Sequence, residues 1–331
     1  MIRAKISGTG SCMPEKILTN QDIEKMVDTS HEWIFARTGI NERRIAAEGE
    51  FTSDLATTAA QRALEMAGVD AQEIGLIVLG TISADYPWPA TACIVQKNLG
   101  ATNAYAYDIS AACSGFIYAL ASAVDYIVSG RGKKALVIGA ETLSRIIDWS
   151  DRNTCVLFGD GAGAVVLEAS DDETGILSTH LHSDGSYLDL LYQPGFATRH
   201  MPSVSGIEAH LPFLKMQGNE VFKVAVRMLT EVSLEALHTH NLGPEDVSLF
   251  IPHQANRRIL EATAKRIKLT EDQVCINVHK YGNTSSATIP VAMDEACRAG
   301  QLKKGDLLLM SAFGGGFTWG SALVRWSIQD N

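Results

Sequence analysis

Residues 69–80 read VDAQEIGLIVLG, and residues 243–254 read GPEDVSLFIPHQ. Both stretches pass from a polar turn into an apolar run, which is typical of a buried strand. Aligning Glu73 with Asp246 superimposes the two runs at an offset of 173 residues. A repeat of this length indicates that the chain contains two copies of one supersecondary pattern.

The repeat extends to both sides of these strands. Amphipathic helical segments precede them, at residues 54–68 and 221–242. Further matched pairs are the helices at 90–99 and 257–267, the strands at 104–109 and 274–278, and the closing strands at 159–168 and 319–326. We therefore expect two similar halves, residues 1–175 and residues 176–331.

The strands of both halves are apolar along their whole length and alternate with helices. Such strands belong to sheets that helices cover on both faces, so the pattern predicts a layered α/β fold. The chain has 331 residues, of which 46% are hydrophobic and 20% charged. This composition is typical of a globular protein and excludes a disordered or collagen-like chain.

Charge and cysteine spacing exclude several classes of function. The net charge of −10 argues against a nucleic-acid binder, which needs a surplus of Lys and Arg. The six cysteines include no CxxC pair, so they predict neither a zinc ribbon nor a thioredoxin motif. The first twenty residues lack an apolar signal-peptide core, and the apolar runs are too short for membrane spans, so we expect a cytoplasmic protein with no membrane partner.

Three polar residues stand where predicted strands end. Cys113 begins a helix after the strand at 104–109, His253 closes the run LFIPHQ, and Asn283 lies in a glycine turn. Ligands bind at such edges of open α/β sheets, so the repeat should bring these side chains to one central pocket. The helix N-terminus at Cys113 should also favour the thiolate. Taken singly, each residue also fits a structural role: a small buried thiol, a satisfied histidine and a turn-former.

Two glycine-rich segments are candidates for ligand-binding loops. FGGGFTWG at 313–320 has no GK[ST] and is not a phosphate loop, but its bare backbone can offer N–H groups to an oxyanion. GDGAG at 159–163 lacks the dinucleotide spacing GxGxxG, so a nicotinamide cofactor is rejected.

Taken together, the motifs resemble one family along nearly the whole chain. They are WIFARTGI (33–40), DISAACSGF (108–116), IPHQAN (251–256), YGNTSSA (281–287) and FGGGFTWGSALVRW (313–326). The sequence resembles the β-ketoacyl-[acyl-carrier-protein] synthase III family of thiolase-like condensing enzymes. That resemblance implies the thiolase-like αβαβα fold made of two duplicated halves.

The resemblance also implies a reaction that starts type II fatty acid synthesis. Cys113, His253 and Asn283 would form the catalytic triad. Cys113 would accept the acyl group of a short acyl-CoA, with acetyl-CoA expected, and malonyl-acyl carrier protein would then lose CO2 and attack it. His253 and Asn283 would donate hydrogen bonds to the enolate, and the N–H groups of Cys113 and Gly315 would form the oxyanion hole. No metal or other cofactor is implied, since the CoA thioester is a substrate.

Further residues carry binding roles by the same resemblance. Trp33, Arg37, Thr38, Arg152 and Asn256 would bind CoA, and Phe158 and Trp88 would line the acyl pocket. A large Trp88 predicts a short pocket. Thr29 and Glu32 form a capping box that would start the helix carrying Trp33. Lys223, Arg257, Arg258, Lys265 and Arg266 would dock the acidic carrier protein, and pairing of two 104–109 strands would form a homodimer.

Three alternatives remain at this level. The triad also fits a polyketide-type or other acyl-CoA condensing enzyme of the same fold. Cys, His and Asn also serve thioester hydrolysis or proteolysis. A non-catalytic subunit that binds acyl carrier protein is the third, although such a protein usually loses its nucleophile.

Overall fold

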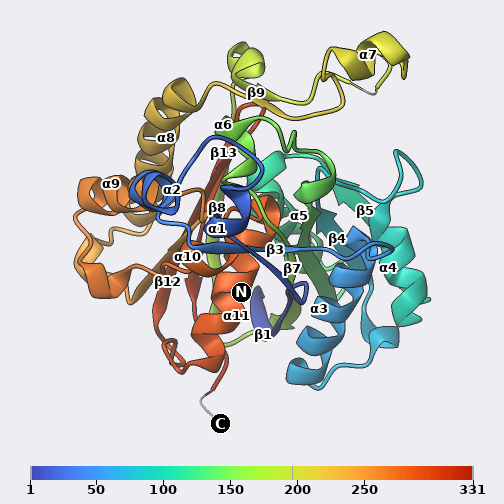
Figure 1. Cartoon of the computed structure of the whole chain (residues 1–331). Helices are drawn as coiled ribbons and strands as arrows, with labels where there is room; N and C mark the ends of the chain where they lie inside the picture. The colour runs from blue at the N-terminus through green and yellow to red at the C-terminus, as the bar shows by residue number, and fades with distance from the viewer. Residues whose placement is uncertain (1, 196, 330–331) are drawn as a thin grey trace.

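The computed structural model describes residues 2–195 and 197–329, and it contains two main sheets with helices on their faces (Figure 1). The first sheet has five strands in the order β1-β7-β6-β4-β5. The pairs β6-β4 and β4-β5 are parallel, whereas the pairs β1-β7 and β7-β6 are antiparallel. The strands are β1 (Arg3–Cys12), β4 (Leu76–Gly80), β5 (Tyr105–Ile109), β6 (Lys134–Thr142) and β7 (Asp160–Ser170).

The second sheet has four strands in the order β11-β12-β13-β8. Read in reverse, β8-β13-β12-β11 matches β1-β7-β6-β4 of the first sheet, with the same parallel and antiparallel pairs. The strands are β8 (Gly175–Ser183), β11 (Leu249–Pro252), β12 (Leu307–Gly314) and β13 (Thr318–Arg325). The strands of the first sheet thus end at Ser170 and those of the second begin at Gly175. The duplicated α/β architecture expected from the repeat is confirmed.

The predicted strand at 274–278 is wrong. Only an isolated bridge joins Val274 to Phe250, and helix α10 (Val278–Tyr281) begins where the strand should end. The buried side chain of Gln254 makes the hydrogen bonds here that a neighbouring strand would otherwise make. Its Oε1 accepts the N–H groups of Asn277 and Val278 at 3.0 and 3.3 Å, and its Nε2 donates to the carbonyl of Cys275 at 3.1 Å. A side chain from a distant loop therefore satisfies backbone groups that a strand would have paired.

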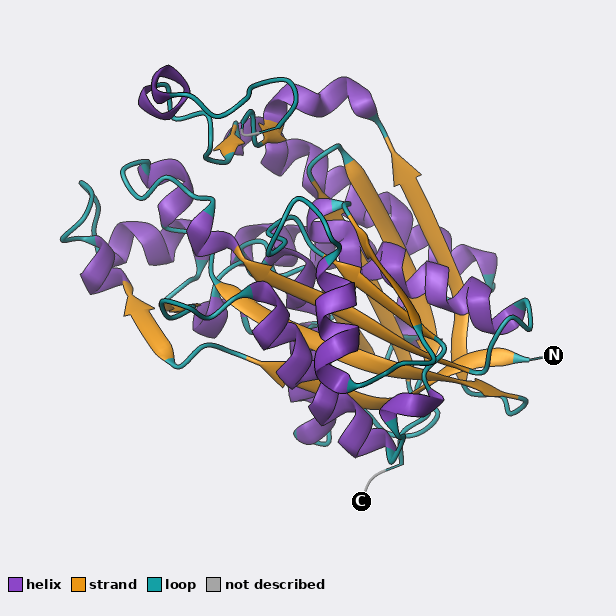
Figure 2. Ribbon diagram, turned by 90° about the vertical axis from the view of Figure 1, so that its right-hand side faces the viewer, coloured by secondary structure: helices purple, strands orange, loops and turns teal. Residues whose placement is uncertain are grey.

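Helices form three layers around the two sheets, an arrangement that Figure 2 shows from the side. α3 (Thr52–Ala67) and α4 (Thr91–Leu99) pack on the first sheet, and α8 (Gly218–Thr239) packs on the second, with α9 (Arg257–Ile267) beside it. α5 (Gly115–Val128) and α11 (Thr288–Arg298) lie between the sheets. The layers are thus α-β-α-β-α, the thiolase-like arrangement that was predicted.

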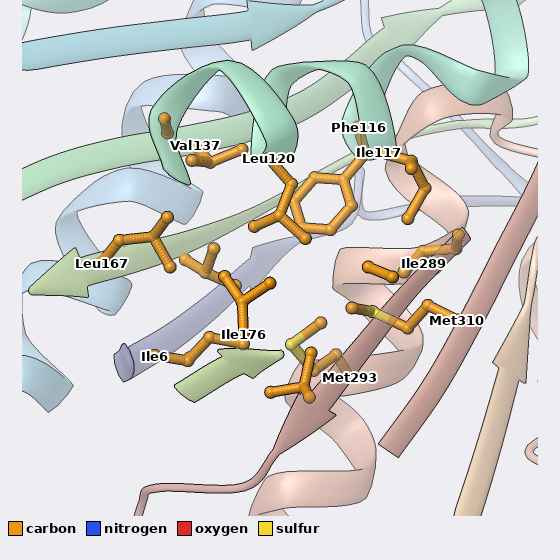
Figure 3. Packing of buried hydrophobic residues seen from close by; sticks show 14 of the residues in the cluster. Ile6, Phe116, Ile117, Leu120, Val137, Leu167, Ile176, Ile289, Met293 and Met310 are labelled. Carbon is orange, nitrogen blue, oxygen red and sulfur yellow. The ribbon is translucent and has the colours of Figure 1, made fainter. Parts of the chain in front are cut away.

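The largest apolar cluster fills the space between the sheets. Figure 3 shows Phe116 and Leu120 of α5, Ile289 and Met293 of α11, and side chains of both sheets converging there. All four of these side chains are at most 1% exposed. Burial of this much apolar surface holds the two halves together as one core.

The two central helices begin in the same way. The 3-10 turn η2 (Ala112–Ser114) precedes α5, and the 3-10 turn η7 (Ser285–Ala287) precedes α11. Ala112 and Ser285 both have positive φ, at 46° and 49°, which is uncommon outside glycine. These matching turns bring the ends of both sheets to one place in the middle of the molecule.

The remaining helices and strands lie mostly around the two main sheets. The segment between β8 and α8 carries α7 and projects from the body at the top of Figure 1. None of the helices in the described part of the chain is long and apolar enough to cross a bilayer. The smaller elements are β2 (Lys16–Thr19), α1 (Asn20–Ile23), α2 (His31–Thr38), β3 (Glu42–Ile45), η1 (Ala71–Glu73), η3 (Leu143–Arg145), α6 (Arg152–Cys155), η4 (Gly185–Leu190), β9 (Leu191–Tyr192), α7 (Val204–Glu208), β10 (Lys215–Met216), η5 (Pro244–Asp246) and η6 (Glu271–Gln273).

Candidate active site

Cys113 lies in η2, between the end of β5 and the start of α5. The chain turns sharply enough here to place Gly314 against it. A Cβ added at Gly314 would lie 2.6 Å from the backbone nitrogen of Cys113, so only glycine fits at that position. Thr318 also donates to the carbonyl of Ala111 at 2.9 Å. The glycine loop between β12 and β13 therefore packs directly on the turn that carries the thiol.

The thiol of Cys113 is protonated in the resting protein. Its side chain is buried, with 7% exposed. Burial raises the pKa of Cys113 to about 12, because little solvent remains to stabilise the thiolate. The Ser285 hydroxyl acts in the opposite direction, and the charge of Glu141 raises the pKa further. The helix N-terminus was expected to favour the thiolate, but desolvation outweighs it, and a nucleophilic role would require a base.

His253 follows β11 and is almost completely buried, with 2% exposed. Its backbone N–H donates to the carbonyl of Ser311 at 2.8 Å, which fixes the residue against β12. Its ring Nδ1 lies 2.8 Å from Oγ1 of Thr288. Burial lowers the pKa of His253 to about 3, so the imidazole is neutral at pH 7.

Asn283 is held by its backbone and by its side chain. Its N–H donates to the carbonyl of Leu157 at 2.8 Å, and its carbonyl accepts the N–H of Gly159 at 3.0 Å. Its Oδ1 accepts the N–H of Ser285 at 2.8 Å. Because the amide oxygen is engaged there, the NH2 end of the side chain is the one that can donate to a ligand.

Cys113, His253 and Asn283 line one cavity of about 1290 Å³. Its walls come from both halves of the chain, and Gly315 lies in the wall beside the thiol. Most of the other residues predicted from the sequence to bind substrates also line this cavity. They are Phe158, Trp33, Arg37, Thr38, Arg152, Asn256, Lys223 and Arg258.

A thiol, a neutral imidazole and an amide NH2 that line one cavity can carry out covalent acyl chemistry. The described residues contain no group of three or more His, Cys, Asp or Glu side chains arranged to hold a metal ion. The polar side chains in place are a protonated thiol, a neutral imidazole and an amide whose NH2 end can donate.

Comparisons with known proteins agree with this arrangement. The family models for 3-oxoacyl-[acyl-carrier-protein] synthase III and for its C-terminal part match residues 107–185 and 237–326. A β-ketoacyl-[acyl-carrier-protein] synthase III from Xanthomonas euvesicatoria is 56% identical over 326 residues, covering 98% of this chain and 99% of its own. The chain belongs to the β-ketoacyl-[acyl-carrier-protein] synthase III family.

Solved structures extend the comparison to the fold. The crystal structure of 3-oxoacyl-[acyl-carrier-protein] synthase III from Aquifex aeolicus superposes with a TM-score of 0.91 at 50% identity, over 98% of this chain and all of that one. The priming β-ketosynthase from the R1128 polyketide pathway gives 0.93 at 35% identity, over 98% and 97% of the two chains. The expectation of an acyltransferase-type condensing enzyme with a thiolase-like fold is confirmed.

In this synthase III chain, three aromatic and cationic groups stack at the mouth of the cavity. The guanidinium groups of Arg37 and Arg152 lie 4.6 and 4.8 Å from the ring centre of Trp33. The helix α2 that carries Trp33 starts at Ser30, whose side chain accepts the N–H of Trp33. The predicted capping box at Thr29 is therefore wrong, because Ser30 is one residue closer to the first turn. Gly39 ends the helix in the left-handed conformation.

Two other residues nominated for CoA lie on helix ends. Thr38 closes α2 and donates to the carbonyl of Ile34 at 2.7 Å. Asn256 caps α9, with its Oδ1 accepting the N–H of Ile259 at 3.0 Å. Both line the cavity, next to the arginines.

The five basic residues nominated for carrier-protein docking divide into two groups. Lys223 and Arg258 line the cavity mouth, where Lys223 pairs with Glu220 at 2.8 Å and Arg258 lies over the ring of Phe222. Arg257, Lys265 and Arg266 are exposed on α9 outside the cavity, and Arg257 pairs with Glu261. Only the first group is thus continuous with the site.

Of the two residues predicted to line the acyl pocket, one lines the cavity and the other does not. Phe158 is buried and lines the cavity beside Leu143 and Leu214. Trp88 is 82% exposed in the single chain and is not among the described residues that form the cavity wall. Within one chain, Trp88 therefore sets no limit on the depth of the pocket.

Sequence reasoning missed four polar residues around the site. Thr288 and Ser285 contact or adjoin the triad, and Gln254 supports the loop before Asn283. Glu141 is fully buried, and it accepts hydrogen bonds from Ser83 of one half and Ser286 of the other. The run NTSSAT carried a signal, since it concentrates hydroxyl side chains after Asn283, but only the fold shows which of them face the site.

Proposed function

We propose that the protein catalyses the decarboxylative condensation of a short acyl-CoA, acetyl-CoA by preference, with malonyl-acyl carrier protein. The products are acetoacetyl-acyl carrier protein, CoA and CO2. The observation that carries this proposal is the single cavity in which Cys113, His253 and Asn283 meet. Relatives named as synthase III over the full length support the same reaction.

In the first half-reaction, Cys113 attacks the thioester carbonyl of acetyl-CoA. The sulfur–carbon bond to Cys113 forms, the bond to CoA breaks, and the thiol proton passes by way of the imidazole of His253 to the departing CoA sulfur. A base is needed because burial keeps the Cys113 thiol protonated. The carbonyl oxygen becomes an oxyanion in this step, and the backbone N–H groups of Cys113 and Gly315 stabilise it.

In the second half-reaction, malonyl-acyl carrier protein enters after CoA has left, so the kinetics are ping-pong. Loss of CO2 leaves an enolate, whose oxygen accepts a hydrogen bond from the Asn283 amide. An amide is well suited to this position, since it stays neutral and cannot repel the malonyl carboxylate. The enolate carbon then attacks the acetyl carbonyl on Cys113, and the thiolate that leaves takes up a proton from solvent. The neutral imidazole of His253 donates a second hydrogen bond to the enolate oxygen before this attack.

Two surfaces would bind the substrates' carriers. Trp33, Arg37, Thr38, Arg152 and Asn256 surround the cavity mouth and would hold the adenine, phosphates and pantetheine arm of CoA. Since both arginines already stack on Trp33, adenine would have to displace one of them. Lys223, Arg257, Arg258, Lys265 and Arg266 would receive the acidic carrier protein.

Starter choice and assembly are linked in this proposal. Strand β5 is the last strand of its sheet, so two copies could pair there to form a homodimer. Trp88 would then reach the acyl pocket of the partner rather than that of its own chain. Trp88→Ala should allow longer acyl-CoA starters than the unchanged protein accepts, whereas Tyr86→Ala, at another exposed aromatic residue of the same loop, should not. An unchanged starter range in Trp88→Ala would remove this role.

The deciding experiment is intact mass spectrometry after mixing the protein with acetyl-CoA. We expect one acetyl group on the unchanged protein and on Cys155→Ser, a control at another buried cysteine, and none on Cys113→Ser. Malonyl-acyl carrier protein should discharge the adduct as acetoacetyl carrier protein. Release of free acetate without use of malonyl-acyl carrier protein would instead establish a thioester hydrolase.

A second candidate differs only in the starter. The structural match to a polyketide priming ketosynthase favours a condensing enzyme that loads a larger acyl group. An adduct that forms with longer acyl-CoA but not with acetyl-CoA would support this reading. The absence of an adduct with every thioester would leave only a carrier-protein-binding subunit.

A further inference from the structure

The hydroxyl of Ser285 is a buried polar group without a partner in the cavity wall. Ser285 is 1% exposed and lines the cavity, and its Oγ makes no hydrogen bond within the described part of the chain. Both backbone groups of the residue are engaged, since its N–H donates to Oδ1 of Asn283 at 2.8 Å and its carbonyl accepts from Thr288 at 2.9 Å. A buried hydroxyl without a partner destabilises the folded protein, which points to a partner that is present only during the reaction.

The fold itself does not require this hydroxyl. Ser285 opens the 3-10 turn η7 with φ of 49°, and Ala112 opens the equivalent turn η2 in the first half with φ of 46°. Alanine therefore supports the same backbone conformation at the same place in the duplicated fold. The hydroxyl is an addition that the second half makes to a shared turn.

The two turns bring this hydroxyl close to the sulfur of Cys113. η2 and η7 contact each other in the middle of the molecule, and a Cβ added at Gly115, just after η2, would lie 3.3 Å from Cβ of Ser286. Burial raises the pKa of Cys113 and of Glu141, and the Ser285 hydroxyl lies near enough to both groups to oppose that effect. Cys113 and Glu141 are therefore the two neighbours to which Ser285 could donate.

Of these two neighbours, Glu141 already has several donors. Its Oε2 accepts from the hydroxyl of Ser83 at 2.5 Å and from the backbone N–H groups of Ile82 and Ser83 at 3.0 and 3.1 Å. Its Oε1 lies 3.1 Å from Oγ of Ser286. The sulfur of Cys113 is a weak acceptor while it is protonated, which explains why Ser285 makes no hydrogen bond in the resting protein. A thiolate at the same place would be a strong acceptor.

We propose that Ser285 is a further catalytic residue, whose hydroxyl donates a hydrogen bond to the Cys113 sulfur when that sulfur is negatively charged. The proposal rests on the condensing reaction proposed above and adds a residue to both of its half-reactions. In the first, the sulfur gains charge as the thiol proton leaves, before the bond to the acyl carbon is complete. In the second, it leaves the acyl carbon as a thiolate. Ser285 keeps its own proton throughout, so the balance of both steps is unaltered.

Alkylation of Cys113 tests this hydrogen bond without any substrate. Iodoacetamide forms a sulfur–carbon bond with the thiolate and releases iodide. Loss of a hydrogen bond to a charged group should lower the thiolate population roughly tenfold or more. Part of this loss is offset, because a less acidic thiol gives a more nucleophilic thiolate. We therefore expect alkylation of Cys113 in full-length Ser285→Ala to be roughly 3- to 10-fold slower than in the unchanged protein, as peptide mass spectrometry at about pH 8.5 would measure.

The half-reactions distinguish this role from damage to the turn. Acetylation of Cys113 by acetyl-CoA should slow about as much as alkylation does in Ser285→Ala. The same variant keeps the backbone N–H that fixes Asn283, so decarboxylation of malonyl-acyl carrier protein in the absence of acyl-CoA should change by less than about threefold. Ser285→Gly also lacks the hydroxyl and suits a positive φ, so it should behave like Ser285→Ala.

Ser233→Ala is the matched control. It removes another buried hydroxyl that has no partner in the described structure, from α8 and from a position that is not among the described residues lining the cavity. It should leave alkylation, acetylation and decarboxylation unchanged.

Unchanged or faster alkylation of Cys113 in Ser285→Ala would overturn the proposal. An equal loss of decarboxylation would also overturn it, because the hydroxyl would then act by holding the turn. If no thioester acylated the unchanged protein, the proposed function would fail, whereas the alkylation rates would still test the hydrogen bond from Ser285 to the Cys113 sulfur.

Discussion

Ala112 and Ser285 share one unusual backbone conformation, with φ of 46° and 49°, at positions 173 residues apart. Each opens the 3-10 turn that leads into a central helix. In one half the next residue is Cys113, and in the other it is Ser286, which donates to the carbonyl of Gly80 at 2.7 Å. The same turn thus presents a nucleophile in the first half and a structural hydroxyl in the second.

The turn at Ala112 should tolerate glycine but not a branched side chain. Ala112→Gly removes the cost of positive φ, so stability should change by less than about 1 kcal/mol, whereas Ala112→Val should lose about 1–3 kcal/mol. Urea unfolding at pH 7.5 measures both. Equal stability of the two variants would mean that the turn relaxes around the larger residue.

Replacement of Asn283 should separate the two half-reactions. Asn283→Asp keeps an oxygen for the Ser285 N–H but loses the NH2 donor and adds a negative charge. Decarboxylation should fall by about 10²–10³-fold, a typical cost of removing one donor to a developing oxyanion. Acetylation of Cys113 should remain within about fivefold, as rapid-quench mass spectrometry would show. Comparable loss of acetylation would place Asn283 in the first step instead.

The buried His253 should make the protein less stable in mild acid. Its pKa is about 3 in the folded protein, against an ordinary value of 6.5, so between these values the unfolded chain binds more protons. Stability therefore falls as pH drops below about 6.5, by about 2 kcal/mol between pH 7.5 and 5 from this group alone. His253→Gln should lose that part of the slope in urea unfolding at several pH values. Parallel curves for the two proteins would contradict the lowered pKa.

The side chain of Gln254 should contribute strongly to the free energy of unfolding. Gln254→Met retains the volume but leaves buried groups of Cys275, Asn277 and Val278 without their partner. Each such group costs about 1–3 kcal/mol, so we expect a loss of at least 2 kcal/mol in urea unfolding. Gln301→Met, at an exposed glutamine, should change stability by less than about 0.5 kcal/mol. A small effect at Gln254 would show that water replaces its amide.

Much of the fold could be predicted because its signals are local and repeated. The offset of 173 residues found from Glu73 and Asp246 recurs in the structure, where β4 begins at Leu76 and β11 at Leu249. Apolar runs and helical periodicity survive in both copies, since each copy buries the same faces. The positions of Cys113 after β5 and of His253 after β11 followed from the same pattern, whereas Asn283 follows the helix α10 and not the strand that was expected before it.

What the sequence could not reveal depends on distant partners. The strand expected at 274–278 is replaced through Gln254, which lies about twenty residues earlier and carries no local sign of this role. The effect of burial on the pKa of Cys113 depends on the whole cavity, not on its helix. The exposure of Trp88 and the contact between Thr288 and His253 likewise depend on tertiary packing between segments that are distant in the sequence.

Because the strand expected at 274–278 does not form, the outer edges of the two main sheets differ. On the second sheet, the turn at Val274 and the amide of Gln254 occupy the side of β11 where a further strand would attach. On the first sheet, β5 has no strand beyond it. A protein with two open margins could add copies without end and form fibres. With one margin sealed, any pairing of two copies through β5 would be self-limiting and would stop at a pair.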